Sequence, residues 1–392
     1  MSGLRFMLVA GEISGDQRAA SLIQSLKSTT ESDDIEFFGA GGSAMKEAGM
    51  DLLMDLTSHA VIGHLDAIRN YFKFRGFFNQ LLDIATERKP DAIILVDYSG
   101  FNLRFAAAIQ NCATGIDGWN PKIIYYVSPQ LWASREGRSK TMVANVDLLL
   151  SIIPFEKQWY AQRLPHFPVE FIGHPLLDEF EGQPPVFSRR AEVPGRPNVL
   201  LLPGSRKGEV TLHLPLLLET AKELSKDKEI DFTMIVPSDE LKEHCQQNGA
   251  EAHGIRLQKG GTREALLNAD LALTKSGTIT LECALYGVPS IVFYITNPLI
   301  YFLGRRLIKV PYLAMPNLIA KAPIFPEYIQ GEATVENLAH SANLFLTDQA
   351  LRQSTLDSLK EVARALGQKG GTQRAALAIQ KEMKFLPAPK QS

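Results

Sequence analysis

The chain has 392 residues, a length that predicts two domains, each with its own buried core. Its composition, 45% hydrophobic and 21% charged, is ordinary for a globular protein, and a formal net charge of −2 gives no overall attraction to nucleic acid. Three widely spaced cysteines argue against a disulfide framework and a CxxC-type metal site, and they fit a reducing cytosol. No window offers the roughly 20 apolar residues of a spanning helix, so we expect a soluble protein or one attached to a membrane from one side.

The chain begins with a predicted strand, residues 4–10, which leads through a glycine turn into a helix with apolar residues at helical spacing. A turn of this shape commonly holds a phosphate at the start of the helix. Here the turn carries Glu12 and Asp16, two carboxylates that would repel a phosphate. The sequence therefore raises the question of what other ligand the turn holds.

A predicted helix over residues 67–82 contains no acidic residue and is apolar over more than half of its circumference. A helix packed on a sheet needs only a narrower apolar stripe, so the excess, with its interleaved basic residues, resembles an interfacial helix. The alternative is a core helix with some basic surface residues. The side chains expected to meet lipid are Arg69, Phe72, Lys73, Phe74, Phe77 and Phe78.

Two continuous apolar runs, residues 92–98 and 122–128, predict strands buried on both faces of a parallel sheet. Asp97 falls at the carboxyl end of the first run, where open α/β sheets bind their ligands. A carboxylate there can take a proton from a sugar hydroxyl as the hydroxyl attacks. The alternative for Asp97 is a turn or cap residue.

A proline-rich, polar segment, residues 181–198, predicts the boundary between the two halves. A second strand, turn and helix follow it, and further strands at residues 232–237, 271–277 and 289–295 alternate with helices. Each half is therefore predicted to be an α/β domain with a Rossmann-like, doubly wound parallel sheet, and the two domains to face each other across a central cleft.

The second half has the better phosphate site. Gly204, Ser205 and Arg206 form a turn ahead of a helix, where backbone amides and a guanidinium group suit a diphosphate. The alternative is an ordinary turn with surface charges.

A second glycine turn strengthens this prediction. Gly277 allows a ligand to approach the backbone, and Ser276 or Thr278 can cap the helix that follows. Glu282 lies about one turn into that helix, where its carboxylate can accept hydrogen bonds from both hydroxyls of a ribose. The alternative for Glu282 is simple pairing with the helix dipole.

Residues 297–318 are also free of acids and carry three basic residues, which suit either lipid head groups or the phosphates of the nucleotide. Neither a D-x-D carboxylate pair nor a cluster of His and Cys at ligand spacing is present, so we expect no bound metal and no other cofactor.

These features together resemble the lipid-A-disaccharide synthase family, glycosyltransferase family 19, whose members are inverting enzymes of the GT-B architecture. The resemblance covers nearly the whole chain, and the order and spacing of its motifs make it specific. Those motifs are VAGEISGD, GAGGSAM, VIGHLDAI, VDYSGFN, YYVSPQLWASREGR, IPFEKQWY, FIGHPLLD, LLPGSRKGEV, SGTITLE and MPNLIA.

The resemblance implies a hexosyltransferase that joins UDP-2,3-diacylglucosamine to 2,3-diacylglucosamine 1-phosphate (lipid X) by a β-1′,6 linkage and releases UDP. It implies Asp97 as general base with Glu12 in the catalytic group. The first turn is then free to line the sugar side of the cleft. The implied donor residues are Gly204, Ser205, Arg206, Ser276, Gly277, Thr278, Glu282 and Asn317, and the implied acceptor or cleft residues are Ser14, Asp16, Asn102 and Ser128.

The chain departs from the usual family pattern at three positions. Gly100 stands where many members have a second aspartate, so the acid–base role falls on Asp97 alone. Ser134 replaces a common tryptophan, and Tyr125 replaces a common histidine. None of these changes removes Asp97 or the donor loops.

We expect an N-terminal acceptor domain over residues 1–180 and a C-terminal donor domain over residues 190–346, with the helices of residues 347–385 packed back on the first domain. The expected location is the cytoplasm, at the inner face of the cytoplasmic membrane, with no nucleic-acid partner and with a homodimer left open. Two alternatives remain: an enzyme like UDP-N-acetylglucosamine 2-epimerase, and a non-catalytic protein that binds nucleotide sugars. The apolar, basic helix at residues 67–82 argues against the epimerase.

Overall fold

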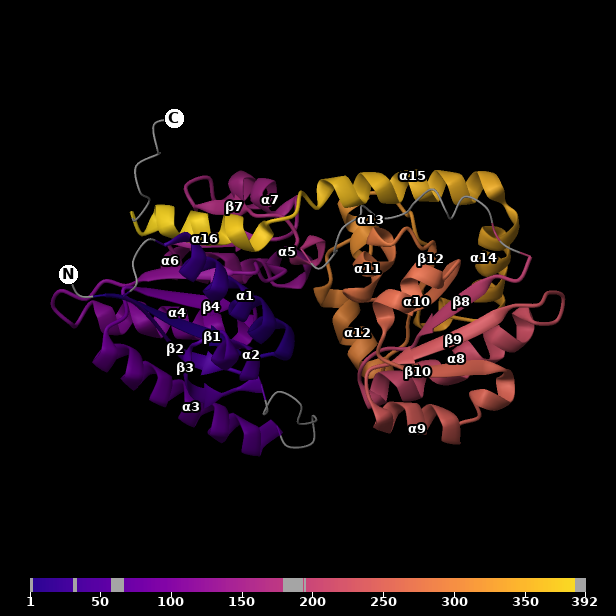
Figure 1. The fold of residues 1–392 in the computed structure, drawn as a ribbon, viewed down its shortest axis with the longest axis horizontal. Coiled ribbons are helices and arrows are strands. Elements are labelled where there is room, and N and C mark those ends of the chain that lie inside the picture. Colours follow the sequence, from indigo (N-terminus) through magenta and orange to yellow (C-terminus); the bar gives the residue numbers. More distant parts are fainter. Residues whose placement is uncertain (1–2, 31–33, 58–66, 179–192, 194, 385–392) are drawn as a thin grey trace. The chain divides into compact units, whose positions relative to one another are not determined.

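The computed structural model of the chain describes residues 3–30, 34–57, 67–178, 193 and 195–384, and for residues 67–74 it describes the backbone alone. The chain forms two compact units. Unit 1 comprises residues 1–179 and 366–392, and unit 2 comprises residues 180–365 (Figure 1).

Unit 1 is built on a seven-stranded parallel sheet with the strand order β3-β2-β1-β4-β5-β6-β7. Its strands are β1 (Leu4–Ala10), β2 (Ile35–Gly41), β3 (Asp51–Asp55), β4 (Ala92–Val96), β5 (Lys122–Tyr126), β6 (Leu148–Ser151) and β7 (Val169–Phe171). Its helices are α1 (Ile13–Thr29), α2 (Ser43–Glu47), α3 (Ala67–Arg88), α4 (Ser99–Ala113), α5 (Leu131–Ser134), α6 (Ser139–Asn145), α7 (Glu156–Arg163) and α16 (Gly371–Glu382).

Unit 2 is built on a six-stranded parallel sheet with the strand order β10-β9-β8-β11-β12-β13. Its strands are β8 (Asn198–Leu202), β9 (Asp231–Val236), β10 (Ile255–Lys259), β11 (Leu271–Lys275), β12 (Ser290–Tyr294) and β13 (Glu327–Ile329). Its helices are α8 (Lys207–Leu224), α9 (Asp239–Gln247), α10 (Thr262–Asn268), α11 (Ile279–Leu285), α12 (Pro298–Leu307), α13 (Met315–Ala320), α14 (Val335–Thr347) and α15 (Gln349–Ala365).

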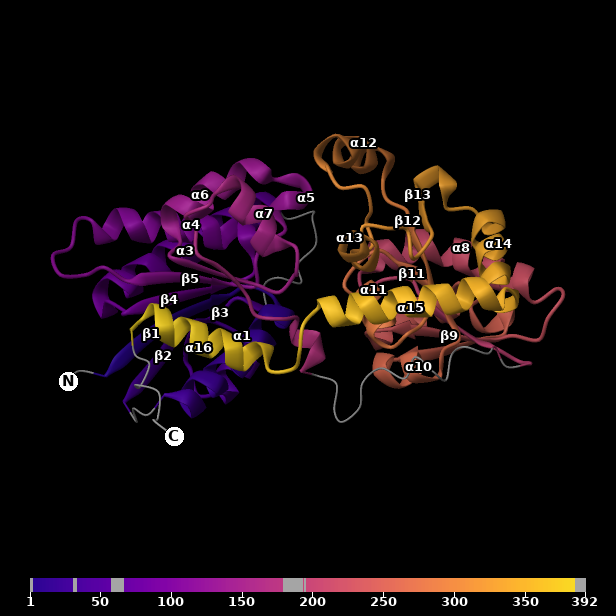
Figure 2. The same ribbon diagram turned by 90° about the horizontal axis from the view of Figure 1, so that it is seen from above.

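The central strands of both sheets are apolar because helices cover both faces of each sheet (Figures 1 and 2). All five residues of β4 are buried, and in unit 2 separate hydrophobic clusters lie on the two faces. The prediction of two doubly wound parallel sheets is therefore confirmed. Among the described residues, no helix has the length and apolar character needed to cross a bilayer.

The two C-terminal helices belong to different units. We expected residues 347–385 to pack on the first domain as a whole, but only α16 does so, against α1. Helix α15 stays in unit 2, where it contacts α11, α13 and α14. The reason is that Leu359 and Val362 of α15 complete a hydrophobic cluster of unit 2. The predicted linker, residues 181–198, falls mostly outside the described residues.

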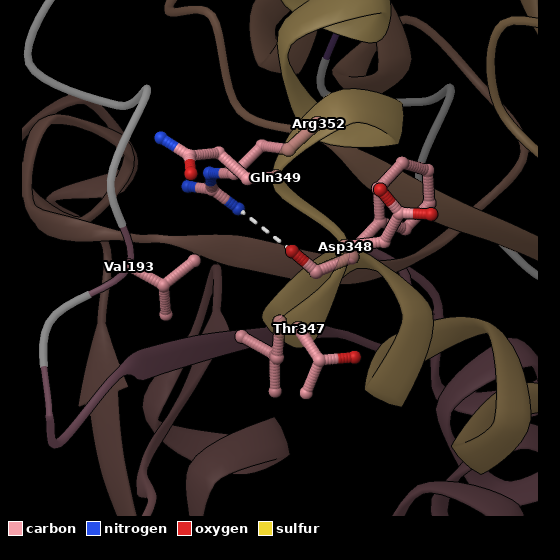
Figure 3. Close-up of a pocket in the computed structure, with 7 residues that line it drawn as sticks. Val193, Thr347, Asp348, Gln349 and Arg352 are labelled. Carbon is pink, nitrogen blue, oxygen red and sulfur yellow. Dashed lines mark hydrogen bonds between the residues drawn. The ribbon is translucent and has the colours of Figure 1, made fainter.

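A buried arginine fastens α15 within unit 2. Arg352 has no exposed surface, and its guanidinium group donates to the carbonyl oxygens of Phe345, at 3.3 Å, and of Asp270, at 2.9 Å. A pocket of about 350 Å³ lies beside it at the junction of α14 and α15 (Figure 3). Val193, which precedes β8, lines this pocket, so the pocket lies by the amino ends of the strands, opposite the edge where ligands of such sheets bind.

Candidate functional site

In unit 1 the strand order reverses between β1 and β4, and the register pairs Ala10 with Val96. Ligands of open α/β sheets bind at this point, outside the carboxyl ends of the strands. Glu12 follows the end of β1 and Asp97 follows the end of β4, so the fold brings these two predicted residues to the same crevice.

The backbone of Asp97 is held in a strained conformation. Asp97 and Tyr98 have φ angles of 48° and 44°, in the left-handed region that costs a non-glycine residue on the order of 1–3 kcal/mol. The carbonyl oxygen of Asp97 accepts hydrogen bonds from Tyr125 Oη, at 2.5 Å, and from Asn102 Nδ2, at 2.9 Å. Its N–H donates to the carbonyl oxygen of Tyr126. Main-chain contacts thus fix the residue and leave its carboxylate for chemistry.

The environment of the Asp97 carboxyl group suits a general base. Burial raises its pKa, and the charge of Arg18 and the N–H of Tyr98 reduce that rise without cancelling it. A raised pKa makes a carboxylate a better proton acceptor near neutral pH.

Tyr98 links Asp97 to the first turn. A Cβ atom on Gly11 would lie 2.3 Å from the Tyr98 ring, so only glycine fits beneath that ring. Burial and the nearby charge of Glu12 both raise the pKa of Tyr98. Glu12 and Ser14 are exposed at the start of α1, where a sugar can reach them.

Three other residues predicted to contact the acceptor serve the scaffold. Asp16 is 4% exposed and accepts the N–H groups of Gly42, Ala44 and Met45 at 2.8–3.1 Å, so it caps α2. Asn102 is fully buried and donates to three carbonyl oxygens at the ends of β1 and β4. Ser128 is also buried. These three side chains are not available to a sugar in this structure, because they are buried and, for Asp16 and Asn102, already hydrogen-bonded to the main chain.

Sequence reasoning missed a buried carboxyl group, Glu156. It has no exposed surface, and it accepts hydrogen bonds from Trp132 Nε1, at 2.8 Å, and from Ser151 Oγ, at 2.5 Å. Burial raises its pKa to about 7, although the hydrogen bonds oppose the rise. Glu156 therefore ties the segments after β5 and β6 together beside Ser128. The motif IPFEKQWY contained this residue, but its apolar surroundings depend on the tertiary fold.

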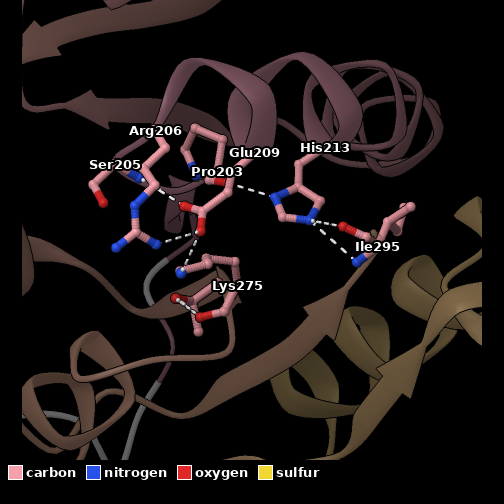
Figure 4. Close-up of polar contacts among 8 residues, drawn as sticks. Pro203, Ser205, Arg206, Glu209, His213, Lys275 and Ile295 are labelled. Atoms are coloured by element: carbon pink, nitrogen blue, oxygen red, sulfur yellow. Dashed lines mark hydrogen bonds and ion pairs between the residues drawn. The ribbon is translucent and has the colours of Figure 1, made fainter. Parts of the chain in front are cut away.

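In unit 2 the strand order reverses between β8 and β11, and the predicted phosphate loop follows β8. Gly204, with φ of 127°, begins the loop, and Ser205 and Arg206 are exposed. The Ser205 N–H donates to Glu209, and Arg206 lies 3.3 Å from the same carboxylate (Figure 4). The loop amide and the guanidinium group thus converge on one anion, as they would on a phosphate.

Lys275 is a further cation at this loop that the sequence did not reveal. Its Nζ lies 3.2 Å from Glu209 Oε1, and both side chains are 17% exposed, against 76% for Arg206. Burial raises the pKa of Glu209. Lys275 and the loop contacts together lower it by more than burial raises it, so the net shift is downward. The signal in the sequence was Lys275 directly before Ser276 and Gly277, at the end of β11.

His213 connects the phosphate loop to the end of β12. Its Nδ1 lies 2.6 Å from the carbonyl oxygen of Pro203, and its Nε2 accepts from the Ile295 N–H at 3.1 Å (Figure 4). Burial lowers its pKa. Nε2 also lies 3.0 Å from the carbonyl oxygen of Ile295, so a neutral ring can donate its one proton either to Pro203 or to Ile295.

The second glycine turn packs against the first loop. Gly277 lies where a Cβ atom would be 3.3 Å from Lys275 Cε, so the absent side chain leaves room for the lysine to reach Glu209. Ser276 Oγ donates to the carbonyl oxygen of Leu313, Thr278 is exposed before α11, and Glu282 lies in the first turn of α11. The N–H groups of Thr280 and Leu281, in the first turn of that helix, donate to the carbonyl oxygens of Gly277 and Thr278.

Asn317, predicted to contact the donor, is fully buried. Its Nδ2 donates to the carbonyl oxygen of Phe325 and to Glu327, and its Oδ1 accepts from the Phe325 N–H. Asn317 therefore holds α13 in place, and both N–H groups of its amide are directed at acceptors within unit 2.

Of the six side chains predicted to meet lipid, Arg69, Phe72, Lys73 and Phe74 lie outside the described side chains. Phe77 and Phe78 are half-buried and pack on the hydrophobic core of unit 1. In the part of the chain that the structure describes, no group of three or more His, Cys, Asp or Glu side chains could hold a metal ion.

Comparison with known proteins agrees with this arrangement. The family model described as lipid-A-disaccharide synthetase matches residues 6–381. The lipid-A-disaccharide synthase of Syntrophus aciditrophicus is 36% identical over 386 residues, covering 96% of this chain and 97% of the relative. That of Geobacter sulfurreducens is 34% identical over 378 residues, covering 95% of each. The chain belongs to the lipid-A-disaccharide synthase family. It is therefore a glycosyltransferase.

Solved structures share the fold at low sequence identity. MurG from Acinetobacter baumannii aligns with a TM-score of 0.59 and 16% identity, over 97% of this chain and 99% of that one. The putative UDP-N-acetylglucosamine 2-epimerase from Listeria monocytogenes aligns with a TM-score of 0.65 and 14% identity over the whole of both chains. These likenesses identify the GT-B architecture, and the family match supplies the activity.

Proposed function

We propose that this protein joins UDP-2,3-diacylglucosamine to 2,3-diacylglucosamine 1-phosphate and gives the β-1′,6-linked disaccharide 1-phosphate and UDP. Membership of the family supports the substrates. The two switch points supply the two kinds of chemistry that the reaction needs: a carboxylate base in unit 1 and an anion-binding loop in unit 2.

The acceptor's 6-hydroxyl oxygen attacks the anomeric carbon of the donor sugar, and its proton passes to the Asp97 carboxylate. The bond between that carbon and the β-phosphate oxygen breaks at the same time, and the electron pair leaves with UDP. A single displacement from the opposite face inverts the anomeric centre. Glu12, exposed beside Tyr98, is placed to hold a sugar hydroxyl during this step.

The leaving diphosphate gains negative charge that unit 2 must stabilise. Arg206 and Lys275 already converge on the Glu209 carboxylate, together with the Ser205 N–H. Preorganised donors and cations of this kind stabilise a developing anion without moving. Glu282, in the first turn of α11, is the proposed partner of the ribose hydroxyls.

The observation that carries the proposal is the Asp97 carboxylate, with a raised pKa on a backbone that other residues hold. Asp97→Asn keeps the shape and all main-chain contacts, so we expect it to fold and to bind UDP normally. Losing a general base lowers the rate by roughly 10²–10⁴. The test is disaccharide formation by the variant, with UDP affinity by calorimetry as the control. Wild-type turnover in Asp97→Asn would remove Asp97 from the mechanism.

We further propose that the protein works on the inner face of the cytoplasmic membrane, because both proposed substrates carry acyl chains. Helix α3 was predicted to provide the contact, and α12 offers a second surface of the same kind. Leu299, Ile300, Phe302 and Leu303 of α12 are each more than half exposed. Arg305 and Arg306 follow in its last turn, and no acidic residue occurs between residues 283 and 326. An apolar face with a basic rim suits an anionic bilayer.

A further inference from the structure

A pocket of about 480 Å³ lies beside the proposed base in unit 1. Tyr98, the residue after Asp97, forms part of its wall, with Gly100 of α4 next to it. Nothing lies within 4 Å of the position that a Cβ atom on Gly100 would take. The missing side chain at this position therefore keeps the pocket wide at the end nearest the base.

The polar lining of the pocket is cationic. It comprises Arg75 and Asn79 of α3 and Arg104 of α4. Arg104 also lies close to Arg138, whose pKa is lowered first by burial and then by the charges of Arg135 and Arg104.

Four arginines lie in this region: Arg75 and Arg104 line the pocket, and Arg135 and Arg138 lie near Arg104. Among the residues that the structure describes, none of their guanidinium groups forms an ion pair with a carboxylate. The nearby carboxylate of Glu136 pairs instead with Arg163, at 2.7 Å. Like charges gathered without a counter-ion repel one another, and an anion bound among them removes that cost.

The pocket also has an aromatic lining. Phe78 and Phe101 line it, with ring centroids 5.4 Å apart, and Phe78 also packs edge-on against Phe105 at 5.6 Å. Their contacts with the core hold these rings in place. A pocket lined by both arginines and fixed aromatic rings suits a ligand that has an anionic group and an apolar part.

We propose that this pocket binds the phosphomonoester of the sugar acceptor, with Arg75 and Arg104 on the phosphate and Phe78 and Phe101 against the adjoining acyl chain. This inference rests on the proposed function, because it assigns a subsite to the acceptor of that reaction. Bilayer phosphates share the same chemistry, but Tyr98 places the pocket next to the base, where the acceptor must lie during the reaction.

The test compares two acceptors in neutral detergent micelles: 2,3-diacylglucosamine 1-phosphate and the same sugar without its phosphate. Wild-type kcat/KM should favour the phosphorylated acceptor by about tenfold or more, the usual effect of a charge-assisted hydrogen bond. Arg75→Ala and Arg104→Ala should lower kcat/KM for the phosphorylated acceptor, mainly through KM, and leave the unphosphorylated one almost unchanged. Arg104→Lys should restore part of the preference because it keeps the charge.

Lys157→Ala, at an exposed cation of α7, is the matched control and should leave the preference unchanged. An unaltered preference in both arginine variants would overturn the inference, even if transfer itself occurs. Loss of binding to anionic vesicles with an unaltered preference would assign the arginines to bilayer lipid and would also overturn it. Absence of disaccharide from the wild-type protein with either acceptor would instead contradict the proposed function.

Discussion

At the scale of single residues, Glu156 makes the stability of unit 1 depend on pH. Its folded-state pKa of about 7 lies above the ordinary value of 4.5, so the folded state binds the proton more tightly than the unfolded state. The corresponding stability is fully present below pH 4.5 and is lost as the pH rises through 7. The shift corresponds to about 3 kcal/mol in the free energy of unfolding.

Glu156→Gln should remove this pH dependence. The amide can still accept from Trp132 Nε1 and can donate to Ser151 Oγ, so it resembles the protonated carboxyl group. We expect the difference in free energy of unfolding between the wild type and the variant to change by a few kcal/mol between pH 5 and pH 8, in favour of the variant at pH 8. Urea unfolding at both pH values measures it. A difference that stays constant with pH would show that Glu156 does not change its protonation on folding.

The sequence located most accurately those candidate residues whose position follows from the end of a strand. Asp97 and Arg206 follow predicted strands, and the structure places them after β4 and β8, although their roles stay predictions. Asp16 and Asn317 were predicted to bind ligands because a motif shows the order of residues and not the groups that they contact in the fold. Their hydrogen-bond partners are the amides at the start of α2 and the main chain of Phe325, and the sequence alone does not show that these groups come together.

The structure also gives a physical role to Tyr125, which departs from the usual family pattern. In the sequence it was only a replacement for a common histidine. In the structure its hydroxyl group donates to the Asp97 carbonyl oxygen and so supports the strained conformation of the base.

At the scale of elements, the loops after β8 and β11 act as one site, because Glu209 joins Arg206 to Lys275. Arg206→Ala, Lys275→Ala and Glu282→Ala should each weaken UDP binding by about tenfold or more, the first two through the diphosphate and the third through the ribose. Calorimetry with UDP measures this, and Lys207→Ala, which removes a cation paired with Glu240 on the surface, is the matched control. Unchanged affinity in all three variants would place the donor elsewhere.

The strands were predictable because they are continuous apolar runs, and their ends were less so. The predicted strand at residues 4–10 coincides with β1. The run at residues 92–98 gives a strand that stops at Val96, because Asp97 and Tyr98 take left-handed conformations that no strand contains. The left-handed backbone at Asp97 and Tyr98 thus ends the strand two residues before the end of the apolar run.

At the scale of the whole molecule, the proposed membrane attachment should depend on apolar contact and on charge together. Leu299→Ser with Phe302→Ser removes two exposed apolar side chains of α12, which are 66% and 53% exposed. We expect weaker sedimentation with anionic vesicles and unchanged UDP affinity. Added salt should weaken wild-type binding as well, since the attraction is screened beyond roughly 8–10 Å. Leu212→Ser on α8 is the control. Equal sedimentation of the double variant and the wild type would leave α12 without this role.

Catalysis should also persist in chelator. The proposed stabilisers of the leaving diphosphate are Arg206, Lys275 and backbone amides, none of which needs a metal. We expect turnover in excess EDTA to match the untreated rate. Loss of activity that magnesium restores would contradict this account of the leaving group.

The position of α16 has a consequence for synthesis of the chain. Unit 1 is discontinuous, since α16 packs on α1, Gln380 donates to Thr29 and Thr30, and Glu382 pairs with Lys122. A ribosome adding about 5–20 residues per second needs on the order of ten seconds or more to make unit 2 before α16 emerges. During that interval the unit that carries the proposed base lacks α16, and unit 2, which ends at residue 365, is complete in sequence before α16 is made. The nascent protein can therefore complete its proposed donor-binding half first, and chaperones have the longest access to the unfinished face of α1.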